Sequence, residues 1–263
     1  MMFEQQSLSQ TQVRVKALSV SLARDAVEVR EAQHLRYRVF ANEMGAQLKS
    51  AASGLDQDEF DPVCEHLIVR DTGSGEVVGT YRVLPAERAT QIGGFYSEQE
   101  FDFSRLTHIR ARMVEIGRSC VHPDYRGGAV VALLWSGLAD YLRRSGDDYL
   151  IGCASVSMND GGHAAANLYR KLSNEVMSPI EWRVFPRSPL PLDRMGNDAR
   201  IVVPPLIKGY LRVGAYICGE PNWDADFNCA DFMMLLPIKT MNDQYARHFM
   251  NKSESAERVS VRQ

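Results

Sequence analysis

Two short stretches of the chain carry side chains whose types and spacing can do chemistry. The first contains Glu115, in an apolar, β-rich stretch over residues 113–121, where a carboxylate can accept and return a proton. The second is Arg126 with Gly127 and Gly128, directly before an apolar helical pattern. Free N–H groups and the dipole at a helix N-terminus favour phosphate, and glycines allow close backbone approach. This stretch therefore indicates a phosphate-binding turn, with an ordinary turn as the alternative.

Strand alternation determines which side chains accompany Glu115. In an extended strand Glu115 and Ser119 share one face, while Arg118 lies on the other. A β-bulge at Gly117 would re-aim the second half of the strand. Without a chemical role, Glu115 and Arg118 would form an ordinary surface ion pair.

The cysteines and histidines form no metal or disulfide pattern. The five cysteines are an odd set without C-x-x-C spacing, which argues against a disulfide framework and a zinc ribbon. No two histidines have convincing metal-ligand spacing, so no metal is expected. Cys120 could be a nucleophile, but no paired base is identifiable, and we interpret it as a buried thiol.

Composition excludes several classes of protein. A chain of 263 residues with 45% hydrophobic and 24% charged residues can bury a full core, which excludes intrinsic disorder. The formal net charge of -3 argues against a generic nucleic-acid binder. We find neither a secretory signal nor an apolar run of the ~20 residues that a membrane span needs. We therefore expect a cytoplasmic protein whose only membrane contact would be peripheral, at the inner face.

Hydrophobic periodicity and turn residues predict the elements that position these side chains. We expect strands at 18–22, 66–69, 77–84, 113–121, 149–154, 215–218 and 230–236, and helices at 25–40, 129–144, 163–172, 204–212 and 242–250. The proline-rich stretch 179–191 is expected to be irregular. The sum is one mixed α/β domain over residues 13–250, largely antiparallel in its first half, followed by a frayed tail at 251–263.

Four motifs in this order resemble those of acyl-homoserine-lactone synthases, within the GNAT N-acyltransferase superfamily. They are LRYRVF at 35–40, DEFD at 58–61, GTYRVLP at 79–85 and EIGR at 115–118. The stretches 115–141 and 204–236, especially LIKGY at 206–210 and CGEP at 218–221, are similar to the ornithine-acyl carrier protein N-acyltransferases that begin ornithine-lipid synthesis. The resemblance implies a GNAT-like fold, with a mixed, mostly antiparallel sheet flanked by helices.

The resemblance also implies an activity. The family transfers an acyl group, in particular a 3-hydroxyacyl group, from the phosphopantetheine thioester of acyl carrier protein to the α-amine of ornithine, which gives a lyso-ornithine lipid. No permanently bound cofactor is implied, and acyl-coenzyme A is an alternative donor. Two other readings stay open: a synthase of the acyl-homoserine-lactone or N-acyl amino acid type that acts on another amine, and a non-catalytic carrier- or lipid-binding module on the same fold.

The resemblance assigns roles to the central strand. An α-amine with a pKa near ~8 attacks a thioester only as the free base, so Glu115 is expected to remove its proton directly or through water. The main-chain N–H groups of Ser119, Cys120 and Val121 are expected to stabilise the oxyanion. A bulge at Gly117 is expected, and it would splay this strand from its neighbour.

Further residues of the matched motifs are expected to bind the substrates. Those for the acceptor are Arg36, Arg38, Phe40, Asp58, Asp61, His66, Arg82 and Arg118, and those for the phosphopantetheine are Arg126, Gly127, Gly128 and Ala129. The arginines could hold the acceptor carboxylate or instead lock Asp58 and Asp61 in a structural network. Ala129 and Val131 replace glycines of the usual coenzyme A pattern, which favours a carrier-protein arm.

Charge distribution gives two further expectations. Residues 49–76 contain seven acidic side chains against Lys49 and Arg70, which would attract a diamino-acid cation. The central segment is instead rich in arginine, with Arg105, Arg110 and Arg112 preceding Arg118 and Arg126, and it would give an acidic carrier protein a docking side.

Overall fold

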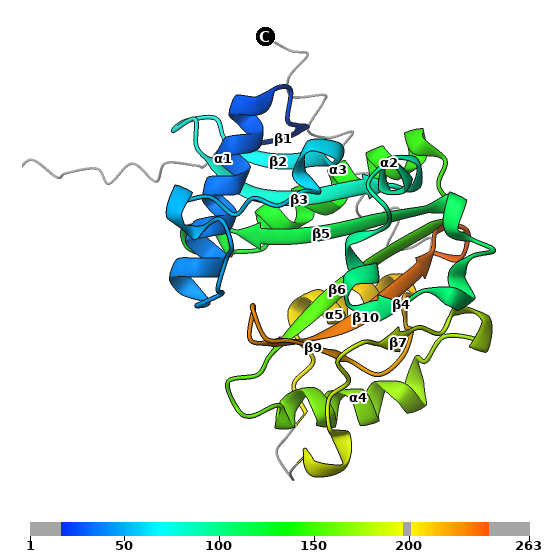
Figure 1. Cartoon of the computed structure of the whole chain (residues 1–263). Coiled ribbons are helices and arrows are strands. Elements are labelled where there is room, and N and C mark those ends of the chain that lie inside the picture. The colour runs from blue at the N-terminus through cyan, green and yellow to red at the C-terminus, as the bar shows by residue number, and fades with distance from the viewer. Residues whose placement is uncertain (1–16, 197–200, 242–263) are drawn as a thin grey trace, which may run out of the picture.

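A mixed β-sheet forms the centre of the protein in the computed structural model, which describes residues 17–196 and 201–241 (Figure 1). The strand order is β1-β2-β3-β5-β6-β10-β8, with β9 also paired to β10. The sheet strands are β1 Leu18–Leu22, β2 Glu65–Asp71, β3 Val77–Pro85, β5 Met113–Val121, β6 Tyr149–Ser157, β8 Tyr216–Ile217, β9 Asn222–Asp224 and β10 Cys229–Pro237. All of these strand pairs are antiparallel except β5 with β6.

Helices cover both faces of the sheet. They are α1 Ala26–Tyr37, α2 Ala86–Gln91, α3 Ala129–Ser145, α4 His163–Glu175 and α5 Pro205–Val213. Alternation along β2 separates the faces, because Leu67 and Val69 pack into the core beside α3 while Ile68 packs with α1. Figure 1 shows α1 in front of the sheet and α3 behind it.

The first helix begins and ends for local reasons. The Asp25 side chain accepts hydrogen bonds from the N–H groups of Val27 and Glu28, which is the expected N-cap. The α-helix ends at Tyr37, and the chain continues as a π-helical turn over Arg38–Glu43. The helix expected through residue 40 is thus correct in place but changes its hydrogen-bonding pattern at Arg38.

Most expected elements are present, and the differences concern short ones. The strand expected at 215–218 has only two residues, since it pairs with β10 at Met234 and Leu235 alone. The 179–191 stretch contains the short strand β7 Phe185–Pro186, which pairs with β4 Phe101–Asp102. Helix α2 and strands β4 and β9 were not expected from the sequence. The helix expected at 242–250 and the tail at 251–263 lie outside the described residues.

A bulge in β5 and a divergence from β6 create the space for a site. Arg82 of β3 lies opposite Gly117, but Thr80 lies opposite Cys120, so β5 contains one extra residue between these pairs. Arg118 within the bulge has a φ of 49°, which is uncommon for a residue with a side chain. The β5–β6 pairing ends at Glu115 with Ile151. The expected bulge and splayed strands are therefore confirmed, with Arg118 as the residue that takes the strained conformation.

Gly152 permits the last close contact of β5 and β6 before they diverge. A Cβ atom on Gly152 would lie 2.3 Å from the Ile116 carbonyl oxygen. Gly152→Ala should therefore lower the free energy of unfolding by about 1–3 kcal/mol, measured by urea denaturation. Gly127→Ala is the control, because no atom lies within 4 Å of its Cβ position. Equal denaturation midpoints for both variants would contradict this account.

Candidate active site

A cavity of about 340 Å³ lies beside the bulged end of β5. β5 forms one wall, and the others come from β6, β10, the 96–100 segment and the π-helical turn after α1. The expected site residues that line it are Phe40, Arg82, Glu115, Arg118, Ser119, Cys120, Val121 and Arg126. Those outside the lining are Arg36, Arg38, Asp58, Asp61, His66, Gly127, Gly128 and Ala129.

Glu115 is buried in the cavity wall and fixed by a neighbouring loop. Its carboxylate accepts hydrogen bonds from the Tyr96 N–H at 2.7 Å, from the Ser97 N–H at 2.9 Å and from the Ser97 hydroxyl. Burial raises the pKa of Glu115, while the hydrogen bonds from Ser97 and Tyr96 and the charge of Arg82 oppose this increase. The alternative prediction of a surface ion pair between Glu115 and Arg118 is therefore wrong, because Glu115 is buried and its hydrogen bonds go to the loop.

The bulge turns Arg118 toward the same loop. Its guanidinium lies 3.2 Å from the Asp56 carboxylate and 3.4 Å from that of Asp58. The same group lies 4.7 Å from the ring centre of Tyr96 and 4.7 Å from that of Phe227. Two carboxylates and two aromatic rings thus hold a cation in the cavity wall.

A buried network of arginines and aspartates supports this wall from behind. Arg36 donates to Asp56 and to Asp61, each at 2.8 Å, and Arg82 donates to Asp58 at 2.6 Å. Burial alone would raise the pKa of Asp61, but the adjacent charges of Arg36 and Arg82 hold it at about 2. Of the two roles considered for Arg36 and Arg82, the observed contacts are those of the structural network.

Arg38 and His66 lie at the margin of this network. Arg38 pairs with Glu76 at 2.6 Å, and both side chains are about half exposed. The buried His66 ring bonds to the Asp61 carbonyl oxygen at 3.0 Å. Burial lowers the pKa of His66, so its ring is neutral near pH 7 and serves to position the Asp61 turn.

The acidic segment 49–76 does not form the free cation site that its composition suggested. Asp56, Asp58 and Asp61 are paired with the arginines described above. Glu65 pairs with Arg88 at 2.6 Å, and Glu76 pairs with Arg38. The expectation is wrong because the neutralising arginines come from other parts of the chain.

The backbone around Ser119, Cys120 and Val121 lines the cavity after the bulge. These residues follow the point where β6 ceases to pair with β5, so no strand from that side covers them. Burial raises the pKa of the Cys120 thiol to about 12, and this thiol is therefore protonated and unreactive near pH 7. Its interpretation as a buried thiol is confirmed.

The glycine turn leads into α3 as expected. Gly128 caps this helix with a φ of 93°, and no atom lies within 4 Å of the Cβ position of Gly127 or Gly128. Arg126 lines the cavity and pairs with Glu43 at 2.6 Å. The turn thus presents open backbone at the cavity rim, beside an arginine that is already paired.

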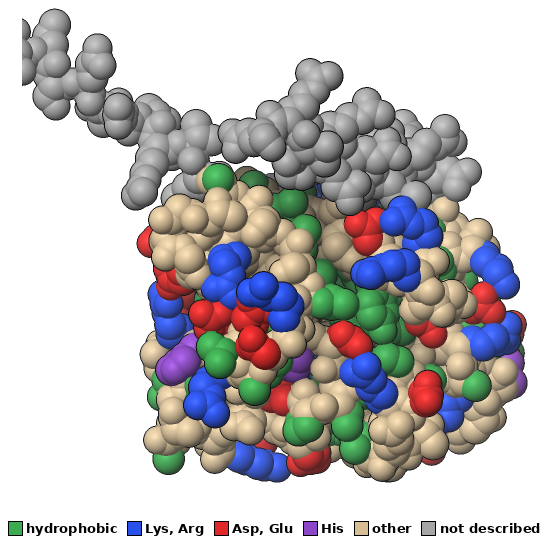
Figure 2. Space-filling view, turned by 90° about the horizontal axis from the view of Figure 1, so that it is seen from above, with side chains coloured by type: hydrophobic (Ala, Val, Ile, Leu, Met, Phe, Trp, Pro, Cys, Tyr) green, Lys and Arg blue, Asp and Glu red, His purple; other side chains and the backbone are tan. Residues whose placement is uncertain are grey.

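The arginines of the central segment do not form a free basic surface. Arg110, Arg112, Arg118 and Arg126 each have a carboxylate partner within 3.4 Å. Figure 2 shows acidic and basic side chains lying together on both sides of a central hydrophobic area. Because these arginines are paired with carboxylates, the sequence count overstates the basic character of the central segment.

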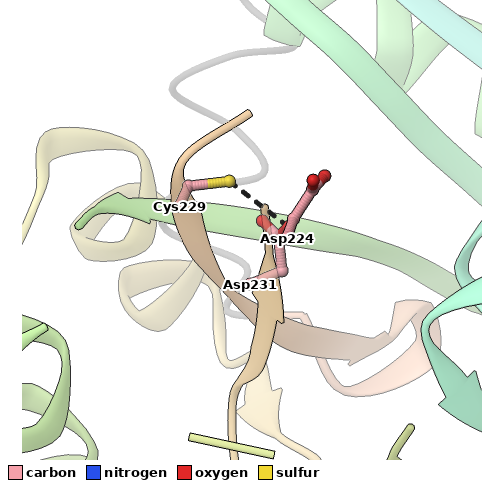
Figure 3. Close-up of side chains that lie close together, drawn as sticks. All are labelled: Asp224, Cys229 and Asp231. Carbon is pink, nitrogen blue, oxygen red and sulfur yellow. Dashed lines mark hydrogen bonds between the residues drawn. The ribbon is translucent and has the colours of Figure 1, made fainter. Parts of the chain in front are cut away.

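A second group of carboxylates, which sequence reasoning missed, lies in the cavity. The β9–β10 pairing places Asp224 opposite Cys229, next to Asp231, and one ligand atom from each lies within 4.8 Å of the others (Figure 3). The Cys229 thiol donates to Asp231 at 3.4 Å, and the Ser155 hydroxyl donates to Asp231 at 2.6 Å. A cation could bind here, and no local motif reveals it because the residues meet only in the folded sheet.

These features define the protein as an acyltransferase of the GNAT class. Residues 35–136 match the family model for the acetyltransferase (GNAT) domain, a span that includes the β5 bulge and the glycine turn. The chain is also 37% identical to the L-ornithine N(alpha)-acyltransferase of Brucella abortus (strain 2308) over 254 residues, which cover 90% of each chain. It therefore belongs to the family of L-ornithine N(alpha)-acyltransferases.

One solved structure supports the fold, and a second one is similar. FeeM, an N-acyl amino acid synthase from uncultured soil microbes, aligns with a TM-score of 0.50 and 11% identity over 85% of this chain and 92% of that chain. The acyl-homoserine-lactone synthase LasI aligns with a TM-score of 0.48 and 12% identity over 84% of this chain and 90% of that chain.

The buried network should dominate the stability of the site. Arg36→Met leaves Asp56 and Asp61 buried without their partner, so the free energy of unfolding should fall by about 3–5 kcal/mol. Arg38→Met removes an exposed pair and should cost at most about 1 kcal/mol. Urea denaturation of both variants measures the difference. Equal losses of unfolding free energy in the two variants would show that burial of the network contributes nothing to stability.

Proposed function

We propose that this protein transfers an acyl group from acyl carrier protein to the α-amine of L-ornithine, which yields a lyso-ornithine lipid. The main observation that supports this proposal is the match to L-ornithine N(alpha)-acyltransferases along nine-tenths of the chain. The cavity supports it by combining the buried carboxylate of Glu115, the guanidinium of Arg118 and Arg126 from the turn before α3.

We assign the proton transfer to Glu115. The α-amine nitrogen attacks the thioester carbonyl carbon, and its proton passes to Glu115 directly or through a water molecule. A carboxylate has about four acceptor positions, so the three hydrogen bonds from residues 96–97 leave one for this proton. Burial raises the pKa of Glu115, which brings this pKa closer to the pKa of the amine. The tetrahedral intermediate then collapses, the C–S bond breaks, and the thiolate leaves and takes up a proton.

Backbone and guanidinium groups have complementary roles in this scheme. N–H groups of Ser119, Cys120 and Val121 stabilise the oxyanion on the side of β5 that no longer pairs with β6, while Cys120 and Val121 stay paired with β3 on the other side. Arg118 binds the α-carboxylate of the acceptor from the cavity wall. Arg36, Arg82, Asp58 and Asp61 act as positioning residues that hold Arg118 in place.

The donor side of the proposal includes a path for a long acyl chain. A second cavity of about 240 Å³ is almost wholly apolar, with Trp135, Leu142 and Val213 in its lining. Ile116 and Tyr210 line both the reaction cavity and a small gap in the core, and Leu150 and Leu236 line both that gap and the second cavity. The phosphopantetheine would then lie along the open turn at Gly127 and Gly128, with acyl-coenzyme A as the alternative donor.

Mass spectrometry tests donor, acceptor and base together. Purified protein is incubated with 3-hydroxyacyl carrier protein and a pool of free amino acids, and an N-acyl-ornithine product is expected. Glu115→Gln should lower kcat about 10²- to 10⁴-fold, since it removes the proton acceptor but keeps the shape. Glu59→Gln is the matched control, because this exposed carboxylate bonds only to Gln99 among the described residues.

Each of the other possible outcomes would indicate a different function for this protein. A lactone or another acylated amine would move the chain to the acyl-homoserine-lactone or N-acyl amino acid synthases. Carrier binding without any acylated product would indicate a non-catalytic module. Full activity of Glu115→Gln would remove the base assignment while leaving the reaction in place.

We also propose that the protein works at the inner face of the membrane, where its amphipathic product would enter the lipid phase. No helix among the described residues is long and apolar enough to span a bilayer, so contact would be peripheral. Ile180 is 70% exposed and Phe185 is 47% exposed on the segment around Trp182. The other segment considered, near Phe249, lies outside the described residues.

Vesicle flotation tests this contact. The wild type should float with phospholipid vesicles, and Ile180→Asp should reduce the bound fraction about tenfold because an apolar anchor is lost. Val27→Asp is the control, since Val27 is 69% exposed on α1. Wild-type protein that stays wholly at the bottom of the gradient would remove the proposal.

A further inference from the structure

Three carboxylates in the cavity wall have no role in the transfer described above. They are Glu100, from the loop that also carries Tyr96 and Ser97, Asp224 at the end of β9, and Asp231 on β10. All three line the same cavity as Glu115 and Arg118. Asp224 and Asp231 lie together on the paired strands β9 and β10, and Glu100 is close enough for their charges to raise its pKa.

These carboxylates differ from Asp56 and Asp61 of the arginine network in having no ion-pair partner among the described residues. Across the described residues, no Lys, Arg or His makes an ion pair with Glu100, Asp224 or Asp231 within 4.0 Å. Asp56 and Asp61 of the network, in contrast, both pair with Arg36. Buried negative charge without a partner is costly, so this end of the cavity is complementary to a cation that the chain itself does not supply.

Burial and mutual repulsion act on the same groups. Burial raises the pKa of Asp231 to about 6, and burial together with the charges of Asp231 and Asp224 raises the pKa of Glu100 well above its usual range, even though the charge of Arg118 opposes the increase. A cation placed between these carboxylates would relieve this repulsion and favour their ionised forms.

Two intervening side chains, Ser97 and Cys153, connect Glu100 to the proposed reaction centre. The Ser97 hydroxyl contacts both Glu115 and the Cys153 thiol, the latter at 3.3 Å, and this thiol donates to Glu100 at 3.8 Å. A molecule with its reacting amine at Glu115 and a second, charged amine at the end of a short methylene chain would reach both places. The acceptor of the related family, ornithine, has this chemistry.

We propose that Glu100, Asp224 and Asp231 bind the side-chain ammonium of the acceptor and so select a diamino acid. This inference rests on the proposed function. An ammonium has three N–H donors and can bond all three carboxylates. A neutral amino acid of the same length would leave the carboxylates unpaired, which is the situation that gives strong discrimination.

The test compares ornithine with norvaline, which lacks only the side-chain amine. In the wild type, kcat/KM should be much higher for ornithine than for norvaline. Asp231→Asn and Asp224→Asn should each lower kcat/KM for ornithine about 10- to 100-fold and leave that for norvaline unchanged. The Asn side chain keeps the shape and can still accept the Ser155 hydrogen bond at position 231.

Asp226→Asn is the matched control, because Asp226 is exposed on the same hairpin and does not line the cavity. It should leave both kcat/KM values unchanged. Thermal unfolding of each variant verifies that the fold is intact, and Asp224, which is less buried than Asp231, provides the second variant if Asp231→Asn does not fold.

Three results would overturn the assignment. Equal losses for ornithine and norvaline would make the carboxylates part of the general catalytic machinery, and unchanged values would exclude them from binding. Loss of activity with EDTA and its recovery with a divalent metal would assign Asp224, Cys229 and Asp231 to a metal ion.

Titration calorimetry separates this inference from the proposed function. Ornithine should bind the wild type more tightly than norvaline, and Asp231→Asn should abolish the difference, whether or not any product forms. Absence of acylation with a preserved binding preference would reject the reaction and keep the ammonium site. Equal binding of the two amino acids by the wild type would reject the ammonium site.

Discussion

Between Gly117 and Cys120, strand β5 contains one residue more than the strand it pairs with, and the position of the charged groups depends on this insertion. In a regular strand, Glu115 and Arg118 would point to opposite faces. The bulge brings both side chains to the loop at Tyr96, one through hydrogen bonds and the other through its guanidinium. The backbone strain at Arg118 persists because two aspartates and two aromatic rings hold the side chain.

The two sets of buried carboxylates illustrate how partners decide the role of a charge. Asp56 and Asp61 are compensated within the chain, so they stabilise the wall and keep arginines in place. Asp231 is as buried as they are and Glu100 is partly buried, but both line the cavity without an ion-pair partner among the described residues. The same functional group is therefore structural on one side of the cavity and available to a ligand on the other.

The sequence predicted the fold well where the signals are local. Strand β5, helix α3 and the Asp25 cap follow from alternation, helical periodicity and side-chain capping. The site was predicted in part, because Glu115 and Arg118 belong to one strand. The carboxylate group at Asp231 could not be predicted, since it forms through the pairing of β9 with β10 and the arrival of a loop more than a hundred residues away. The charge of residues 49–76 misled for the same reason, as its neutralising arginines lie at positions 36, 82 and 118.

The cavity wall contains residues from Val39 to Asp231, so segments from both halves of the described chain contribute to it. Contacts of such long sequence separation form late in folding, because loop closure must precede them. A fragment that ends before β10 would lack one wall of the cavity, even if the bulge and the arginine network had formed. Acyl transfer would thus report the completion of folding of the entire sheet, and a polypeptide still emerging during synthesis would have no active form.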